Sequence, residues 1–293
     1  MRTLTLLGKR FWVILSFIFS IVYGHAQTYE QNVRSIIDAL AADSLEKAEG
    51  LIHETLRLDP ARDSNPILYQ YLGEIYQRRG ENEKALDAYN KGIALLPTAG
   101  QLSTFRSHLP AFISLMLSRA SLYLQLNNLE RALTDYSKVL EQEPDNEESL
   151  FFRAYIYSQQ RRNKEARADY DHLLEVNPMH EDGRLGLAIL NSKDNRPREA
   201  LEQLDALILL YPTHARHYLA RCGFYEKRKE YEKAMKDVGQ ALELEPKNPE
   251  CYLTRASLYL AMKKKRLAGQ DCRKAITLGA SPEQVSPLLD AIQ

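Results

Sequence analysis

The chain of 293 residues has three cysteines, one tryptophan and no excess of charge of either sign. Lys and Arg number 39, as do Asp and Glu, so the formal net charge is zero. Proteins that bind nucleic acid through its phosphates carry basic patches, and we therefore predict no nucleic-acid partner. The cysteines fit no zinc-binding spacing, and the histidines belong to no HExxH motif. We accordingly predict no metal site and no cofactor.

Long apolar runs are also scarce, and the clearest one lies close to the N-terminus. It extends over residues 11–23 and is too short to span a bilayer comfortably. Three basic residues precede it, and Gly24-His25-Ala26 follows it. This pattern predicts a secretory signal peptide over residues 1–26, cleaved after Ala26. We expect an exported protein, with the bacterial periplasm as its compartment. The alternative is an uncleaved membrane anchor with the remaining chain outside the cytoplasm.

The most regular feature of the chain is a period of 34 residues. It separates four prolines, Pro144, Pro178, Pro212 and Pro246, and five alanines, Ala132, Ala166, Ala200, Ala234 and Ala268. A fixed period of this length predicts stacked helical units rather than one globular core. The units in phase with the prolines are 113–146, 147–180, 181–214, 215–248 and 249–282. Upstream lie a further unit, 66–99, and a degenerate one, 29–62.

Each unit has the pattern of two amphipathic helices of about 12–14 residues. Positions 8 and 20 of the unit hold small residues, which allow the two helices to approach closely. Positions 11 and 24 hold mostly large residues that fill the space around this contact. The proline at position 32 ends the second helix.

The unit 66–99 carries the most complete motif, formed by Tyr69, Leu72, Gly73, Tyr76, Ala85, Tyr89 and Pro97. It resembles the tetratricopeptide repeat, with tyrosine in place of the first tryptophan. The resemblance implies an all-α, right-handed superhelical solenoid of antiparallel helix pairs. Such a solenoid needs a terminal cap, and we predict a C-terminal capping helix over residues 283–293.

Two segments depart from the period. Residues 100–112 are an insert, which is either a loop near the binding face or an extension of the neighbouring helices. In the tail, Ser281-Pro282 and Ser286-Pro287 each resemble an N-cap followed by proline at the first helical position. We expect Leu288, Leu289 and Ile292 to cover the last repeat.

Charges at positions 7 and 23 vary together along the chain. Where position 7 is arginine, position 23 is aspartate: Arg119 with Asp135, Arg153 with Asp169, Arg221 with Asp237, and Arg255 with Asp271. Where position 7 is leucine, at Leu72 and Leu187, position 23 is Ala88 or Gln203. We predict structural ion pairs between the two helices of a unit. A row of arginines that binds a ligand is the alternative interpretation.

The resemblance also implies a concave face lined by the first helix of each unit. On this chain the candidate residues are apolar: Leu117, Phe151, Phe152, Tyr155, Leu185, Ile189, Leu219 and Leu253. Such a face suits an apolar peptide or an amphipathic partner helix. The alternative is that packing within the superhelix buries part of this stripe.

We therefore expect a non-enzymatic scaffold with a protein or peptide partner, no catalytic residues and no small-molecule substrate. The second hypothesis is an accessory factor that docks a cell-envelope assembly or a polysaccharide-export complex. It draws on the basic turns within units, such as Lys263-Lys264-Lys265-Arg266, which could associate with a membrane complex. Cys222, Cys251 and Cys272 are expected to be buried, although an oxidising compartment would allow one disulfide among them.

Overall fold

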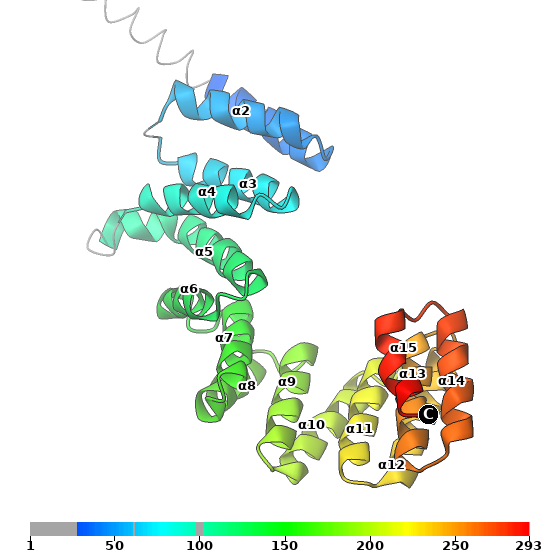
Figure 1. The fold of residues 1–293 in the computed structure, drawn as a ribbon. Coiled ribbons are helices and arrows are strands. Elements are labelled where there is room, and N and C mark those ends of the chain that lie inside the picture. Colours follow the sequence, from blue (N-terminus) through cyan, green and yellow to red (C-terminus); the bar gives the residue numbers. More distant parts are fainter. Residues whose placement is uncertain (1–27, 61, 98–101, 293) are drawn as a thin grey trace, which may run out of the picture. The chain divides into compact units, whose positions relative to one another are not determined.

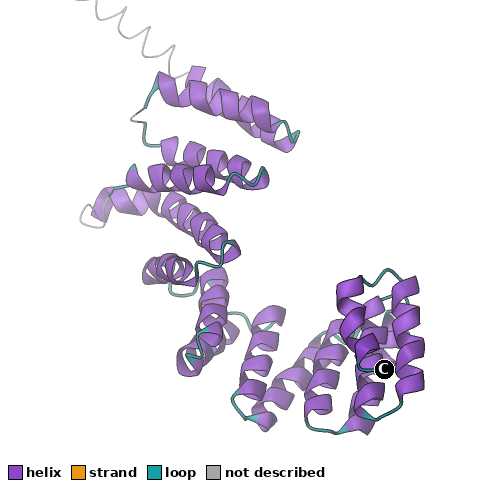
Figure 2. Ribbon diagram, in the orientation of Figure 1, coloured by secondary structure: helices purple, strands orange, loops and turns teal. Residues whose placement is uncertain are grey.

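The computed structural model describes residues 28–60, 62–97 and 102–292, and within these ranges every regular element is a helix (Figure 2). The predicted signal peptide, residues 1–26, lies outside the described residues. The chain divides into two compact units, Met1–Pro144 and Asp145–Gln293, which are described separately. Among the described residues, no helix is both long enough and apolar enough to cross a bilayer.

The first described element of the N-terminal unit is a helix over residues 28–41, and five further helices follow it among the described residues (Figure 1). These are α2 (Leu45–Leu58), α3 (Asn65–Arg78), α4 (Asn82–Ala94), α5 (Leu102–Gln125) and α6 (Leu129–Gln142). Helix α3 packs along α4, and α5 packs along α6. Because α4 and α3 also contact α5, successive pairs stack on each other.

The C-terminal unit contains four helix pairs and a final helix. The pairs are α7 (Glu147–Gln159) with α8 (Asn163–Val176), α9 (Glu181–Lys193) with α10 (Pro197–Leu210), α11 (Ala215–Lys227) with α12 (Tyr231–Leu244), and α13 (Pro249–Ala261) with α14 (Lys265–Thr277). Helix α15 (Pro282–Asp290) packs against α13 and α14. Since each second helix also contacts the next first helix, the pairs form a stack within this unit.

Within each pair, the turn depends on one residue with a positive φ angle. This residue always occupies position 15 of the 34-residue repeat. The seven residues are Asp43, Gly80, Asn127, Arg161, Asn195, Lys229 and Lys263, with φ between 53° and 74°. The left-handed conformation costs most residues about 1–2 kcal/mol. One of these turns uses glycine and three use Asp or Asn, which tolerate this conformation, whereas Arg161, Lys229 and Lys263 adopt it against their local preference.

The prolines of the period end the second helices. The residue before each proline has left the helical region: φ and ψ are −126° and 86° at Glu143 and −133° and 89° at Asn177. Tyr211 and Glu245 show the same change before their prolines. The ring of a following proline disfavours the helical conformation, so the chain turns toward the next unit at these points.

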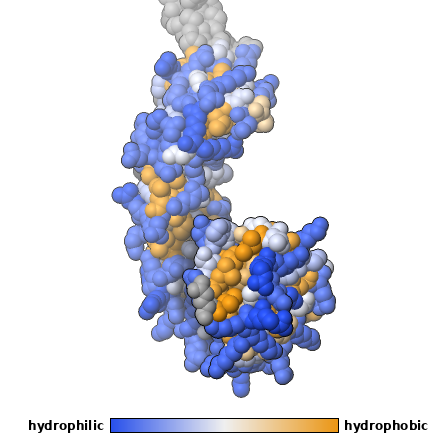
Figure 3. Space-filling model, turned by 45° about the vertical axis from the view of Figure 1, so that its right-hand side comes forward, coloured by the Kyte–Doolittle hydropathy of each residue, from blue (hydrophilic) through white to orange (hydrophobic). Residues whose placement is uncertain are grey.

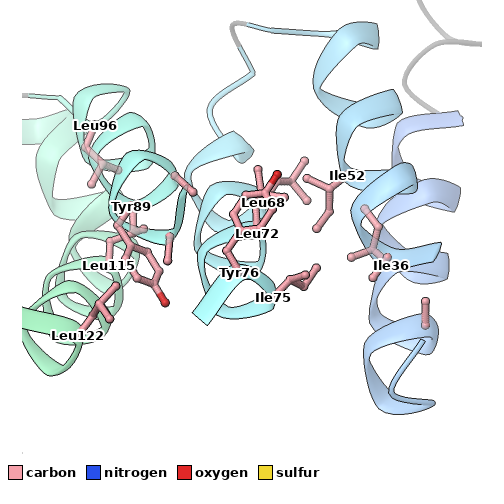
Figure 4. Close-up of a cluster of buried hydrophobic side chains, with 14 of the residues drawn as sticks. Ile36, Ile52, Leu68, Leu72, Ile75, Tyr76, Tyr89, Leu96, Leu115 and Leu122 are labelled. Carbon is pink, nitrogen blue, oxygen red and sulfur yellow. The ribbon is translucent and has the colours of Figure 1, made fainter. Parts of the chain in front are cut away.

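Small residues at positions 8 and 20 bring the two helices of a pair together. Ala120, Ala132, Ala154 and Ala166 are fully buried. At position 8 of the unit 66–99, a Cβ atom on Gly73 would collide with the ring of Tyr89, which occupies position 24 and is itself fully buried. Figure 4 shows Tyr89 among the buried side chains of the N-terminal unit. The helix spacing is therefore set by a small residue facing a large one.

Residues 102–112 of the insert form the first part of α5 and continue without a break into its repeat portion. This matches the helix-extension alternative rather than the loop. Helix α15 has Ser281 at its N-cap, where the backbone N–H of Ser281 donates to Gln284.

The prediction of a second helix start at Ser286-Pro287 is wrong, because both residues lie inside α15. Leu288 and Ile292 pack against the last helix pair, whereas Leu289 is 36% exposed and does not cover it as expected.

Candidate functional site

Each arginine at position 7 forms two parallel hydrogen bonds with the aspartate at position 23. In the pair Arg153–Asp169, Nε lies 2.7 Å from Oδ2 and Nη2 lies 2.7 Å from Oδ1. The same two contacts, at 2.7–2.9 Å, join Arg119 to Asp135, Arg221 to Asp237, and Arg255 to Asp271. The four aspartates are buried. These arginines are therefore occupied inside the helix pairs rather than displayed as a row for a ligand.

The tyrosine at position 11 completes this arrangement. The guanidinium carbon of each arginine lies 5.9 Å from the ring centroid of Tyr123, Tyr157, Tyr225 or Tyr259, within the range of a cation–π contact. Hydrogen bonds to the buried aspartates raise the pKa of Arg153 and Arg255 above the usual arginine value. One ionic and aromatic cluster thus recurs in four repeats.

In the unit 181–214, one of the two units with leucine at position 7, a neutral contact replaces this cluster. Leu187 takes position 7 and is buried, and Gln203 takes position 23. The Gln203 side chain accepts a hydrogen bond of 2.7 Å from Nη1 of Arg184 instead. The arginine and the aspartate are thus replaced together, so no carboxylate at position 23 is left without an arginine partner.

A groove of about 440 Å³ lies in the C-terminal unit. Helices α9 and α11 form most of it, and α13 contributes Glu250 and Thr254. Apolar residues dominate its wall: Leu185, Ala188, Ile189, Leu204, Leu219, Ala220 and Phe224. Ile189 is 46% exposed, although it is a large apolar side chain. The groove is therefore an apolar surface open to solvent, bordered by Arg216, Lys227 and Glu250.

Three of the eight candidate residues for a concave face line this groove: Leu185, Ile189 and Leu219. Leu219 is also part of the core, being only 9% exposed. Leu253 packs against the cluster around the last helix pair. Leu117 belongs to the N-terminal unit, where it packs beside Ile113, Met116 and Val139.

The aromatic residues of α7 lie outside the lining of the groove. Phe151 stacks on His180 and makes edge-to-face contacts with Phe152 and Tyr170. Phe151 and Phe152 are partly buried, whereas Tyr155 is 40% exposed. Phe151 thus takes part in packing within its own repeat, and Tyr155 is the most accessible of the three.

Apolar surface on the C-terminal unit is not confined to isolated side chains. Figure 3 shows apolar residues gathered in one area of this unit, with hydrophilic residues around them. Contiguous apolar surface of this kind is typical of sites that contact another molecule.

All three cysteines are free and buried, as the small-hydrophobe interpretation expects. Burial raises the pKa of the Cys222 thiol to about 12 and that of Cys251 to about 11. At neutral pH these thiols are protonated, and a protonated thiol is a poor nucleophile. The cysteines therefore contribute packing rather than chemistry.

Family models for the tetratricopeptide repeat match residues 117–180 and 185–250, residues 66–99, and residues 249–279. Together these matches cover more than half of the chain. The chain belongs to the tetratricopeptide repeat family. Proteins with this fold are generally scaffolds for protein interactions.

Solved structures show the same architecture. A tetratricopeptide repeat protein from Parabacteroides merdae ATCC 43184 is 28% identical, with a TM-score of 0.70 over 91% of this chain and 99% of that one. PilF of Pseudomonas aeruginosa is 18% identical, with a TM-score of 0.55 over 79% of this chain and 98% of that one. At such low identity, the likeness to PilF concerns the fold alone.

One curated relative is an enzyme, but the match to it is short. The UDP-N-acetylglucosamine–peptide N-acetylglucosaminyltransferase of Giardia intestinalis is 36% identical over 75 residues, which is 26% of this chain. The chain spans only 4% of the length of that protein. The match gives no reason to assign transferase activity to this tetratricopeptide repeat protein.

Proposed function

We propose that this chain is a non-enzymatic scaffold that captures an apolar peptide segment or a partner helix in the groove between α9, α11 and α13. The observation that supports the proposal is the exposure of Ile189, a large apolar side chain, on the predominantly apolar wall of the groove. An extended peptide can bury alternate apolar side chains against such a wall, and a helix can bury apolar side chains spaced three and four residues apart. Burial of each apolar side chain contributes about 1.5–3 kcal/mol before the entropy of association is subtracted.

The rim of the groove adds a preference for charge. Arg216 and Lys227 border it from α11, and Glu250 borders it from α13. A peptide with an acidic residue beside its apolar side chains would place that residue near the two basic ones. Rim charges of this kind affect orientation and association rate more than affinity.

The groove is tested by replacing Ile189 with aspartate, which places a charge within the apolar wall. Leu209→Asp is the matched control, because Leu209 is 81% exposed and does not line the groove. We expect Ile189→Asp to lower recovery of the partner from an envelope fraction at least tenfold and Leu209→Asp to leave it unchanged. Equal recovery with both variants, each folded by circular dichroism, would refute the groove as the binding surface.

We also propose that the protein is exported and acts in the cell envelope, because residues 1–26 have the pattern of a signal peptide.

A second candidate function is docking to an anionic envelope complex, which the exposed basic turns Lys227-Arg228-Lys229 and Lys263-Lys264-Lys265-Arg266 favour. Docking through these turns is electrostatic, so raising the salt concentration should weaken it strongly. Capture in the apolar groove should depend little on salt.

A further inference from the structure

Three side chains with metal-binding atoms converge where α9 and α11 begin. Glu181 is the first residue of α9, His214 is the N-cap of α11, and His217 lies in the first turn of α11. One ligand atom from each lies within 4.8 Å of the others. His214 Nδ1 is 3.3 Å from Glu181 Oε2, and His217 Nε2 is 2.9 Å from Glu181 Oε1.

His214 departs from the usual role of its position in the repeat. Position 34 is an N-cap, and the side chains of Asn146, His180 and Asn248 there each accept a hydrogen bond from a backbone N–H of the following helix. The ring of His214 makes no such bond. Its Nδ1 faces the Glu181 carboxylate instead, so helix capping does not account for a histidine at this place.

A neutral His217 ring cannot satisfy the hydrogen-bonding needs of both of its nitrogens at once. Its side chain is fully buried, and Nδ1 has no hydrogen bond of normal geometry, although Tyr211 lies beside the ring. A neutral imidazole ring has only one N–H. With the proton on Nε2, Nδ1 is a buried acceptor without a partner. With the proton on Nδ1, the lone pair of Nε2 faces a carboxylate oxygen.

We propose that Glu181, His214 and His217 bind a divalent transition-metal ion, for which zinc is the best match. Two imidazole nitrogens and one carboxylate are a common zinc ligand set, with water in the fourth position. A cation between Nε2 and the carboxylate removes the conflict in His217, because Nδ1–H can then point toward the Tyr211 backbone, as metal-binding histidines commonly do. The ion joins the first helices of two successive repeats.

Among the described residues, Arg216 is the one arginine or lysine that forms an ion pair with Glu181, and a bound metal ion would displace it from that carboxylate. Its Nη1 lies 3.2 Å from Glu181 Oε1, while its Nη2 lies 2.6 Å from Asp182 Oδ1. The side chain is 51% exposed. Arg216 can therefore leave Glu181 and remain paired with Asp182 at the surface.

The spacing of these ligands follows the repeat and not a short motif. They occupy positions 1 and 34 of one unit and position 3 of the next. The equivalent positions at the other in-phase junctions lack a complete set: Ile113, Asn146 and Ser149; Glu147, His180 and Gly183; Ala215, Asn248 and Cys251. Because Glu181 precedes the two histidines by about one repeat, only the stacking of units brings it to them.

The decisive variant is His214→Asn, because asparagine already occupies position 34 at Asn146 and Asn248 and caps the next helix there. His180→Asn is the matched control, in which a histidine at the same repeat position but outside the cluster is replaced. Full-length protein carrying a histidine-free tag is stripped with a chelator and titrated with zinc against a chromophoric competitor. Bound zinc is counted by elemental analysis.

We expect one zinc ion per chain for the wild type and for His180→Asn, and affinity at least about 100-fold weaker for His214→Asn. Glu181→Gln, which keeps the shape of the side chain, is a second variant and should weaken binding likewise. Zinc should raise the unfolding temperature of the wild type and not that of either ligand variant. Equal zinc affinity in the wild type and both ligand variants, or no zinc bound by the wild type, would overturn the proposal.

Discussion

Replacing Arg153 with leucine isolates the role of the repeated ion pair. The variant removes both hydrogen bonds to Asp169 and leaves the Asp169 carboxylate, whose side chain is 9% exposed, without its partner. Leucine is a natural residue at this position, since Leu72 and Leu187 occupy it in other repeats. The substitution therefore tests the loss of the charge partner rather than a misfit in shape.

The expected magnitude follows from the burial of the two groups. Removing one partner of a buried ion pair costs about 3–5 kcal/mol. The Arg153 side chain is 23% exposed, so solvent screens part of the interaction, and the lower end of this range, about 3 kcal/mol, applies. The double variant Arg153→Leu/Asp169→Ala reproduces the combination of Leu72 with Ala88. It should cost only about 1 kcal/mol, because no buried charge remains.

The measurement is urea unfolding followed by circular dichroism at neutral pH, since urea does not screen charges. The single variant should have the lowest midpoint, and adding Asp169→Ala should restore most of the loss. A stack of repeats can unfold in steps, so equal slopes of the transitions are needed before free energies are compared. If the double variant is no more stable than Arg153→Leu alone, the buried-charge reasoning is refuted.

Three further predictions concern packing and backbone. Lys263→Gly should stabilise the protein by about 0.5–1 kcal/mol in urea, because φ is 61° at this residue, whereas Lys236→Gly, at an exposed site in the middle of α12, should destabilise it by a similar amount. Gly73→Ala should lower stability by about 1–3 kcal/mol through collision with Tyr89, and an unchanged midpoint would contradict the packing. Burial raises the pKa of Cys222 to about 12 from 9.0. The contribution of the buried thiol to stability is therefore fully present below pH 9.0 and is lost as the pH rises toward 12. Cys222→Ala should reduce this alkaline loss of stability when unfolding is measured as a function of pH.

Much of the repeat architecture could be predicted because it depends on short-range patterns. The proline at position 32 and the small residues at positions 8 and 20 act within one helix pair, at fixed spacing in the chain. The pairing of arginine with aspartate was visible for the same reason, since sixteen residues separate the partners in every case. The insert illustrates the limit, because both a loop and an extension of α5 were compatible with its sequence.

The candidate binding surface was only partly predictable. Ile189 was named from its repeat position and lines the groove, but Phe151, named on the same grounds, packs on Tyr170 and His180. Repeat position indicates the face of a helix on which a residue lies. It does not indicate whether a large neighbour from the adjacent helix already covers that residue.

The sequence by itself determined the repeat unit, its two helices, the turn between them and the ion pairs inside it, because all of these arise between residues at constant separation. Only the tertiary structure decided which apolar residues form an open groove, and that Glu181 meets His214 and His217. These features join residues of different repeats, and their contacts depend on how one unit stacks on the next. That stacking is set by the summed packing of many side chains rather than by a motif in the chain.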